Sequence, residues 1–162
     1  MLELDSLNSV KYLYLRELSE PRDNSLCLVV EEAVCGRSAS TGSAQAELPE
    51  LAEIMKDGWL IESTEGCRTF ELFWKHYVAY LVTEECVGSC GRYEDETYTG
   101  KVLRMYTASH FLNHLARDTG SHIEPIQHYK LTCLNHLIDV AAYAPPEIRL
   151  IDPASPRSLR IQ

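Results

Sequence analysis

Residues 67–82 form the most aromatic stretch of the chain, and they constrain the fold more than any other segment. Five of the chain's fourteen aromatic residues lie here: Phe70, Phe73, Trp74, Tyr77 and Tyr80. Each aromatic ring removes a large apolar area from water when it is buried. We therefore expect this stretch to lie at the centre of the hydrophobic core.

The spacing within this stretch fits two kinds of secondary structure. A helix would bury Phe70, Phe73, Trp74, Tyr77 and Leu81, whereas a strand would align Leu72, Trp74, His76, Val78, Tyr80 and Val82. Aromatic and β-branched residues favour strands, and Gly66 just ahead is typical of a turn. We predict a strand over 70–82, or two strands with a bend near Lys75-His76.

The rest of the chain indicates further strands with two helices. Alternating or apolar runs predict strands at residues 10–18, 26–34, 59–63, 101–106 and 126–143, the last with a bulge or turn at Asn135-His136. Helices are predicted at 49–57, which begins with Pro49, and at 108–119, which carries an apolar stripe and ends at Gly120. Small or polar residues predict loops at 36–46 and 86–100. These elements predict an α+β fold: a curved antiparallel sheet of about six strands with two short helices.

The length of 162 residues is typical of one domain, which we assign to residues 1–150, followed by a flexible tail at 151–162. No apolar run reaches the roughly 18 residues that cross a bilayer. Acids occupy the N-terminal positions where a secretory signal would be basic. We therefore predict a cytoplasmic protein without membrane contact.

The net charge of −9 is unevenly distributed. Residues 1–100 carry 19 acids and 8 bases, whereas residues 101–162 carry 5 acids and 7 bases. An acidic surface attracts basic proteins and repels the phosphates of nucleic acids. The charge therefore predicts a basic protein partner and no nucleic acid, and it leaves a homo-oligomer open. The simpler interpretation is that the negative charge only maintains solubility.

The six cysteines have no framework that fixes their role. Cys27, Cys67 and Cys133 lie in apolar surroundings and are typical of small buried side chains. Cys86 and Cys90 form a Cys-x₃-Cys pair in a glycine-rich loop, which fits free thiols, a local disulfide or half of a zinc site. No second such pair is present, and we predict neither a metal nor another cofactor.

Other candidate chemistry in the sequence is incomplete. His110 and His114 share one helix face at i, i+4, but no glutamate follows the first histidine as a zinc hydrolase would need. Cys133 and His136 would point to opposite faces of one strand. Asp139 interrupts an apolar run, and we expect its carboxylate to face solvent, the alternative being a buried partner.

The most distinctive exposed chemistry follows the aromatic stretch. Three consecutive acids, flanked by tyrosines, fit recognition of a basic protein surface: Tyr93, Glu94, Asp95, Glu96 and Tyr98. An alternative is a pocket for a small molecule or an enzymatic reaction, lined by Cys67, His76, Tyr77 and Tyr80.

The segment His128-Tyr-Lys-Leu-Thr-Cys-Leu-Asn-His-Leu-Ile-Asp-Val-Ala, followed by Pro-Pro-Glu-Ile, resembles small uncharacterised bacterial proteins. Some of those are suspected immunity proteins of toxin systems. The resemblance covers residues 70–82 and 128–148 in general pattern and includes no diagnostic site residue. It implies a non-enzymatic binding protein. Together with the acidic charge, it leads us to expect a protein-binding module, immunity-like in function, that uses an acidic face to bind a basic partner.

Overall fold

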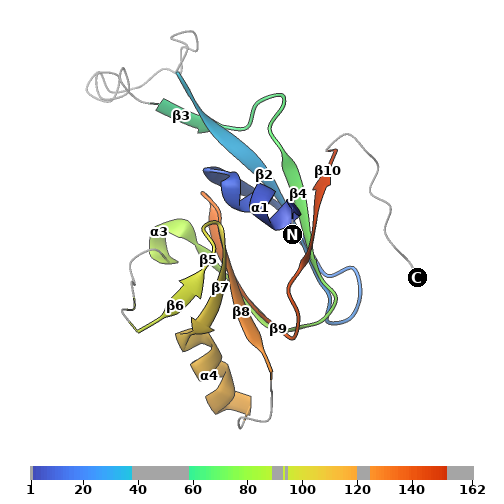
Figure 1. Cartoon of the computed structure of the whole chain (residues 1–162), viewed down its shortest axis with the longest axis vertical. Coiled ribbons are helices and arrows are strands. Elements are labelled where there is room, and N and C mark those ends of the chain that lie inside the picture. Colours follow the sequence, from blue (N-terminus) through green and yellow to red (C-terminus); the bar gives the residue numbers. More distant parts are fainter. Residues whose placement is uncertain (1, 38–58, 89–92, 94, 120–124, 153–162) are drawn as a thin grey trace.

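The computed structural model describes residues 2–37, 59–88, 93, 95–119 and 125–152, and these form two five-stranded antiparallel sheets (Figure 1). The first sheet has the order β1 (Tyr12–Ser19), β2 (Leu26–Arg37), β4 (Thr69–Trp74) and β10 (Glu147–Ile151), with β3 (Trp59–Glu62) paired to the far end of β2. The second has the order β5 (Tyr77–Glu84), β9 (His136–Ala142), β8 (Gln127–Thr132), β7 (Leu103–Ala108) and β6 (Thr97–Thr99).

Three helices accompany the sheets in the described ranges: α1 (Leu2–Ser9), α3 (Glu85–Gly88) and α4 (His110–Thr119). Figure 1 shows α1 between the two sheets and α4 at one end of the second sheet. Helix α4 begins at His110, two residues after the predicted start at 108, and the Ser109 hydroxyl caps it by accepting a hydrogen bond from the Leu112 backbone N–H at 3.2 Å. Among the described helices, none has the length and apolar content needed to cross a bilayer.

The aromatic stretch forms two strands, β4 and β5, joined by a turn at Lys75 and His76. The prediction of strands with a bend at these two residues is confirmed. Strand β4 lies between β2 and β10, and its Phe70, Leu72 and Trp74 side chains are buried. Strand β5 is instead an edge strand of the second sheet, so only the first half of the stretch is central to the core.

One hydrophobic core joins the sheets. Its buried residues come from α1 (Leu7), the first sheet (Leu13, Leu26, Leu28, Val30, Phe70, Leu72, Trp74) and the second sheet (Leu103, Tyr129, Leu131, Ile138, Val140, Ala142). The rings of Trp74 and Tyr129 meet across the two sheets with their centroids 6.0 Å apart. The inward-facing residues of the strands thus form one packed layer.

Helix α1 is attached to the second sheet by one side chain. Asn8 Oδ1 accepts hydrogen bonds from the backbone N–H groups of Lys101, Val102 and Leu103 at 3.1, 2.9 and 3.2 Å. The β6–β7 turn that presents these groups needs Gly100, which has a φ of 89°; a Cβ there would lie 2.1 Å from the Leu103 carbonyl oxygen.

Helix α1 is attached to the first sheet by Arg68. The Arg68 guanidinium donates to both carboxylate oxygens of Glu32, at 2.8 and 2.9 Å, and to the Ser6 carbonyl oxygen at 3.3 Å. A cation at the C-terminal end of a helix also interacts favourably with its dipole. The hydrogen bonds from Arg68 lower the pKa of Glu32.

A second contact between the sheets involves the β8–β9 turn. The Asn135 side chain accepts from the Leu15 N–H at 2.9 Å and donates to the Leu15 carbonyl at 3.0 Å, while Leu134 N–H donates to the Leu13 carbonyl at 2.7 Å. Strand β1 has a register shift between Leu15 and Glu17. Asn135 therefore satisfies backbone groups at an irregular point of an edge strand.

Several sequence predictions change. The antiparallel α+β class holds, but the described residues form ten strands in two sheets, so about six strands in one sheet is not confirmed. The predicted strand at 126–143 is a hairpin, β8 and β9, and α1 and β10 were not predicted. Strand β10 extends to Ile151, into the predicted tail, and the 86–100 loop contains α3 and β6. The predicted helix at 49–57, most of the 36–46 loop and residues 153–162 lie outside the described residues.

We predict that Asn8→Ala destabilises the protein while Asn8→Asp does not. Alanine leaves three N–H groups of the β6–β7 turn without their acceptor, which should lower the free energy of unfolding by about 1–3 kcal/mol. Aspartate keeps the oxygen that accepts these bonds and serves as the matched control. Urea denaturation measures both variants, and equal destabilisation of the two would contradict the assigned role of the oxygen.

We also predict that Glu32 makes stability depend on pH. Because the folded-state pKa of Glu32 is lowered, its stabilisation is fully present above the ordinary carboxyl pKa and is lost as pH falls through the lower folded value. Glu32→Gln should therefore cost roughly 1–2 kcal/mol near pH 7, and the difference from wild type should shrink below about pH 4. Urea denaturation of both proteins at a series of pH values measures this difference in the free energy of unfolding.

The matched control is Glu31→Gln, which removes the neighbouring acid on β2. Its ion pair with Arg16 is more exposed than that of Glu32 with Arg68, so its loss should cost less. A gap between wild type and Glu32→Gln that stays constant from pH 7 to pH 3 would contradict the linkage.

Candidate functional site

The predicted tyrosine and acid residues gather around the N-terminus of α4. Glu96 Oε1 accepts a hydrogen bond from the His110 backbone N–H at 2.9 Å, and Asp95 Oδ1 lies 2.9 Å from His110 Nε2. The ring of Tyr93 contacts the His110 ring with centroids 4.5 Å apart. We call Tyr93, Asp95, Glu96, Tyr98 and His110 the tyrosine–acid surface. The fifth predicted residue, Glu94, lies outside the described residues.

Tyr98 is held by its neighbours in the second sheet. It pairs with Tyr106 across β6 and β7, with ring centroids 5.1 Å apart, and the Arg104 guanidinium lies 4.5 Å from the Tyr98 ring centroid. Strand alternation places Arg104 and Tyr106 on the same face of β7. Tyr98 still exposes 46% of its surface, so an ordered aromatic ring is presented to solvent.

The charge of the surface is set mainly by its acids. The hydrogen bond from His110 lowers the pKa of Asp95, so this carboxylate is ionised at neutral pH. Its side chain remains 73% exposed. The Glu96 carboxylate accepts a hydrogen bond from the His110 N–H at the N-terminus of α4, where a negative group is favourable. The predicted acids are therefore close together, but each already has a contact within the chain.

A buried polar network lies behind this surface, and it was not predicted from the sequence. His128, which is 2% exposed, contacts the Ser109 hydroxyl oxygen through Nδ1 at 2.7 Å and Asp139 Oδ1 through Nε2 at 2.8 Å. Tyr106 stacks on the His128 ring with the ring centroids 4.3 Å apart, and the Phe111 ring contacts the His128 ring with the centroids 5.1 Å apart. Tyr106 thus contacts both Tyr98 and His128.

The expectation that Asp139 faces solvent is wrong. Its carboxylate is buried and has two partners, His128 and the Lys130 ammonium group, whose Nζ lies 3.3 Å from the same oxygen. In the hairpin register Lys130 stands opposite Asp139, so both side chains point to one face. A signal was present in the sequence, since His128 and Lys130 alternate with the apolar Tyr129 and Leu131.

The alternative pocket residues do not meet at one place. Cys67 precedes β4, where its sulfur accepts from the Thr64 N–H at 3.3 Å, and His76 is exposed in the turn after β4. Between Cys67 and His76 lie the six residues of β4, which span about 20 Å. Tyr77 and Tyr80 contact each other at 5.1 Å, and the Tyr80 hydroxyl donates to Glu20. The two tyrosines form a small cluster without Cys67.

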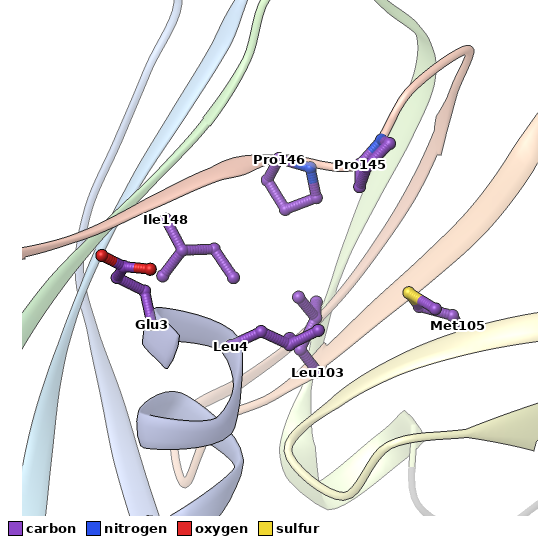
Figure 2. A pocket seen from close by; sticks show the side chains of 7 residues that line it. All are labelled: Glu3, Leu4, Leu103, Met105, Pro145, Pro146 and Ile148. Carbon is purple, nitrogen blue, oxygen red and sulfur yellow. The ribbon is translucent and has the colours of Figure 1, made fainter. Parts of the chain in front are cut away.

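An apolar hollow of about 200 Å³ lies between α1 and the second sheet (Figure 2). It is lined by Glu3 and Leu4 of α1, Leu103 and Met105 of β7, and Pro145, Pro146 and Ile148 before and in β10. Typical ligand sites have volumes of about 300–1,000 Å³ and several converging polar groups. This hollow is smaller, and its one charged lining residue is Glu3.

The two candidate metal-binding histidines of α4 each lie beside a different acid. His110 contacts Asp95, and His114 lies 3.5 Å from Asp118 on the exposed face of α4. In the part of the chain that the structure describes, no three metal-binding side chains cluster as a metal site requires. Cys133 and His136 lie at the β8–β9 turn, where Cys133 N–H donates to the His136 carbonyl; the predicted placement on one strand is wrong.

Comparison of the chain with protein-family models, with curated proteins and with solved structures found no match. The basis for a functional proposal is therefore the geometry of the tyrosine–acid surface and of the buried polar network behind it, which consists of Ser109, His128 and Asp139.

We predict that the cysteines differ widely in reactivity. Burial raises the pKa of Cys133 to about 12 and, with the nearby Glu71, that of Cys27 to about 11. Cys35 and Cys86 are exposed. Since the thiolate is the reactive form, iodoacetamide at pH 8 should modify Cys35 and Cys86 well before Cys27 and Cys133.

Peptide mass spectrometry at timed intervals measures this order, and denatured protein is the control in which the differences should disappear. Repeating the modification experiment without reductant tests the disulfide alternative for Cys86 and Cys90, and repeating it with a chelator tests the zinc alternative. Cys90 lies outside the described residues. Modification of native Cys133 as fast as Cys86 would contradict the predicted burial effect.

Proposed function

We propose that the protein is a protein-binding module that recognises a basic partner through the tyrosine–acid surface. The observation that carries the proposal is the pair of ordered, solvent-exposed tyrosines beside an ionised carboxylate. Tyr93 and Tyr98 are 57% and 46% exposed, yet each ring is held by a neighbouring ring or guanidinium. Tyrosine is among the residues that contribute most to protein–protein binding.

Rigidity supports this proposal energetically. Ordering a mobile side chain on binding costs about 0.5–1.5 kcal/mol. The contacts of Tyr98 with Tyr106 and Arg104 have already restricted its ring in the unbound protein. An exposed ring that is ordered before binding contributes its apolar area to an interface at a reduced entropic cost.

Charge supports a basic partner. Asp95 is ionised and largely exposed, and the whole chain has a net charge of −9. The guanidinium of the nearby Arg104 packs on the Tyr98 ring. Complementary charge accelerates association and disfavours acidic partners. An immunity-like role, in which the module covers the functional surface of a basic protein, is the specific form of this proposal.

The proposal also includes a cytoplasmic setting. The five cysteines in the described residues are free thiols: Cys27, Cys35, Cys67, Cys86 and Cys133. Unpaired cysteines are usual where glutathione and thioredoxin keep thiols reduced.

The test is affinity capture from a lysate of the native organism, followed by a binding measurement with the purified partner. We expect a basic protein that binds wild type and binds Tyr98→Ala at least 10-fold more weakly, as is usual for an interface anchor. Asp95→Asn should mainly slow association and reduce its dependence on salt.

The matched control is Tyr143→Ala, because Tyr143 is similarly exposed but follows β9, which β8 and β7 separate from the β6 strand of Tyr98. Its binding should equal that of wild type. Equal weakening by Tyr98→Ala and Tyr143→Ala, or recovery of only acidic proteins, would refute the proposal.

A further inference from the structure

We propose that Ser109, His128 and Asp139 form a catalytic triad in which the Ser109 hydroxyl attacks small carboxylic esters. The three side chains are connected in that order by contacts of 2.7 and 2.8 Å. A nucleophile bonded to a base, with the base oriented by a carboxylate, defines such a triad whatever the fold. This activity goes beyond the binding proposed above and is tested separately from it.

The hydrogen-bond pattern assigns the roles. A carboxylate can only accept, so His128 carries its proton on Nε2 and donates it to Asp139. Nδ1 is then the acceptor, and the Ser109 O–H donates to it. The Lys130 ammonium group forms an ion pair with the same Asp139 oxygen, which helps to hold the carboxylate in place. The ring is reversed relative to serine proteases, where Nε2 faces the serine, but either imidazole nitrogen can act as the base.

The position of Ser109 also suits a nucleophile. It stands between the end of β7 and the start of α4, where backbone N–H groups point out of the helix. One of these groups, that of His110, already binds a carboxylate oxygen of Glu96 at 2.9 Å. The structure thus shows a negative oxygen next to Ser109. The oxyanion formed when an ester carbonyl is attacked would take the place of this Glu96 oxygen.

The reaction has two balanced steps. Ser109 Oγ bonds to the carbonyl carbon while its proton passes to His128 Nδ1, and the ester C–O bond then breaks as the leaving alcohol takes that proton. Water next attacks the carbonyl carbon of the acyl-Ser109 ester while His128 Nδ1 accepts its proton. The bond from the acyl carbon to Ser109 Oγ then breaks as Oγ takes that proton back, which releases the acid and the free hydroxyl. Ser109 is only 6% exposed, and the Phe111 ring packs against its partner His128, so we infer that the substrates are small acyl esters.

The experiment uses the full chain with two probes, a fluorophosphonate and p-nitrophenyl acetate. We expect one covalent fluorophosphonate adduct on the native protein, located at Ser109 by peptide mass spectrometry. Ser109→Ala should abolish the adduct and lower p-nitrophenyl acetate hydrolysis at least 10-fold. His128→Gln should slow adduct formation by about 100-fold, the usual contribution of a general base.

The matched control is Ser25→Ala, because Ser25 is also buried but bonds to the Arg22 backbone and not to a histidine. It should react as wild type. A merely structural Ser109, serving to cap α4, would give no adduct. Native protein without an adduct at Ser109 therefore overturns the proposal, even if a variant fails to fold. Loss of partner binding in Tyr98→Ala with the adduct retained would separate the two proposals.

Discussion

The two sheets of this protein depend on a small number of side chains that satisfy backbone groups where the sheets meet. Asn8 accepts from three consecutive N–H groups of the β6–β7 turn, and Asn135 makes two hydrogen bonds to Leu15 on the edge of the other sheet. An unsatisfied buried N–H or carbonyl costs about 1–3 kcal/mol. These polar contacts also fix which apolar faces oppose each other. The core, with Trp74 against Tyr129, can then pack as one unit.

The same contacts position the candidate site, although they lie at a distance from it. Asn8 holds the start of β7, and that strand then presents Tyr106 before it ends at Ala108, just ahead of Ser109. Tyr106 contacts Tyr98 on the surface and His128 below it. The site is therefore built on a short strand that is anchored at its beginning and capped by a helix at its end. Sites on such elements keep their geometry better than sites on loops.

Local patterns in the sequence predicted part of the local structure correctly, although α1 and β10 were not predicted. The bend at Lys75-His76 and the helix beginning near Ser109 follow from alternation and from capping, which involve neighbouring residues only. The division into two sheets depends on contacts between distant residues, such as Asn135 with Leu15, that leave no periodic signal. Asp139 was misplaced because residues 126–143 were predicted as one strand, so the hairpin that brings His128 to its carboxylate was not foreseen. An isolated acid in an apolar run normally faces solvent.

The tyrosine–acid surface and the buried polar network of Ser109, His128 and Asp139 are close enough to influence each other. Glu96 and His110 belong to the tyrosine–acid surface, yet the hydrogen bond between them occupies the N-terminus of α4 beside Ser109. A partner bound on Tyr93 and Tyr98 would cover this end of the helix and exclude small molecules from Ser109. An acyl group on Ser109 would in turn displace Glu96 and alter the charge that the partner meets. Since coupling between two ligands is reciprocal, occupancy of either place should weaken binding at the other.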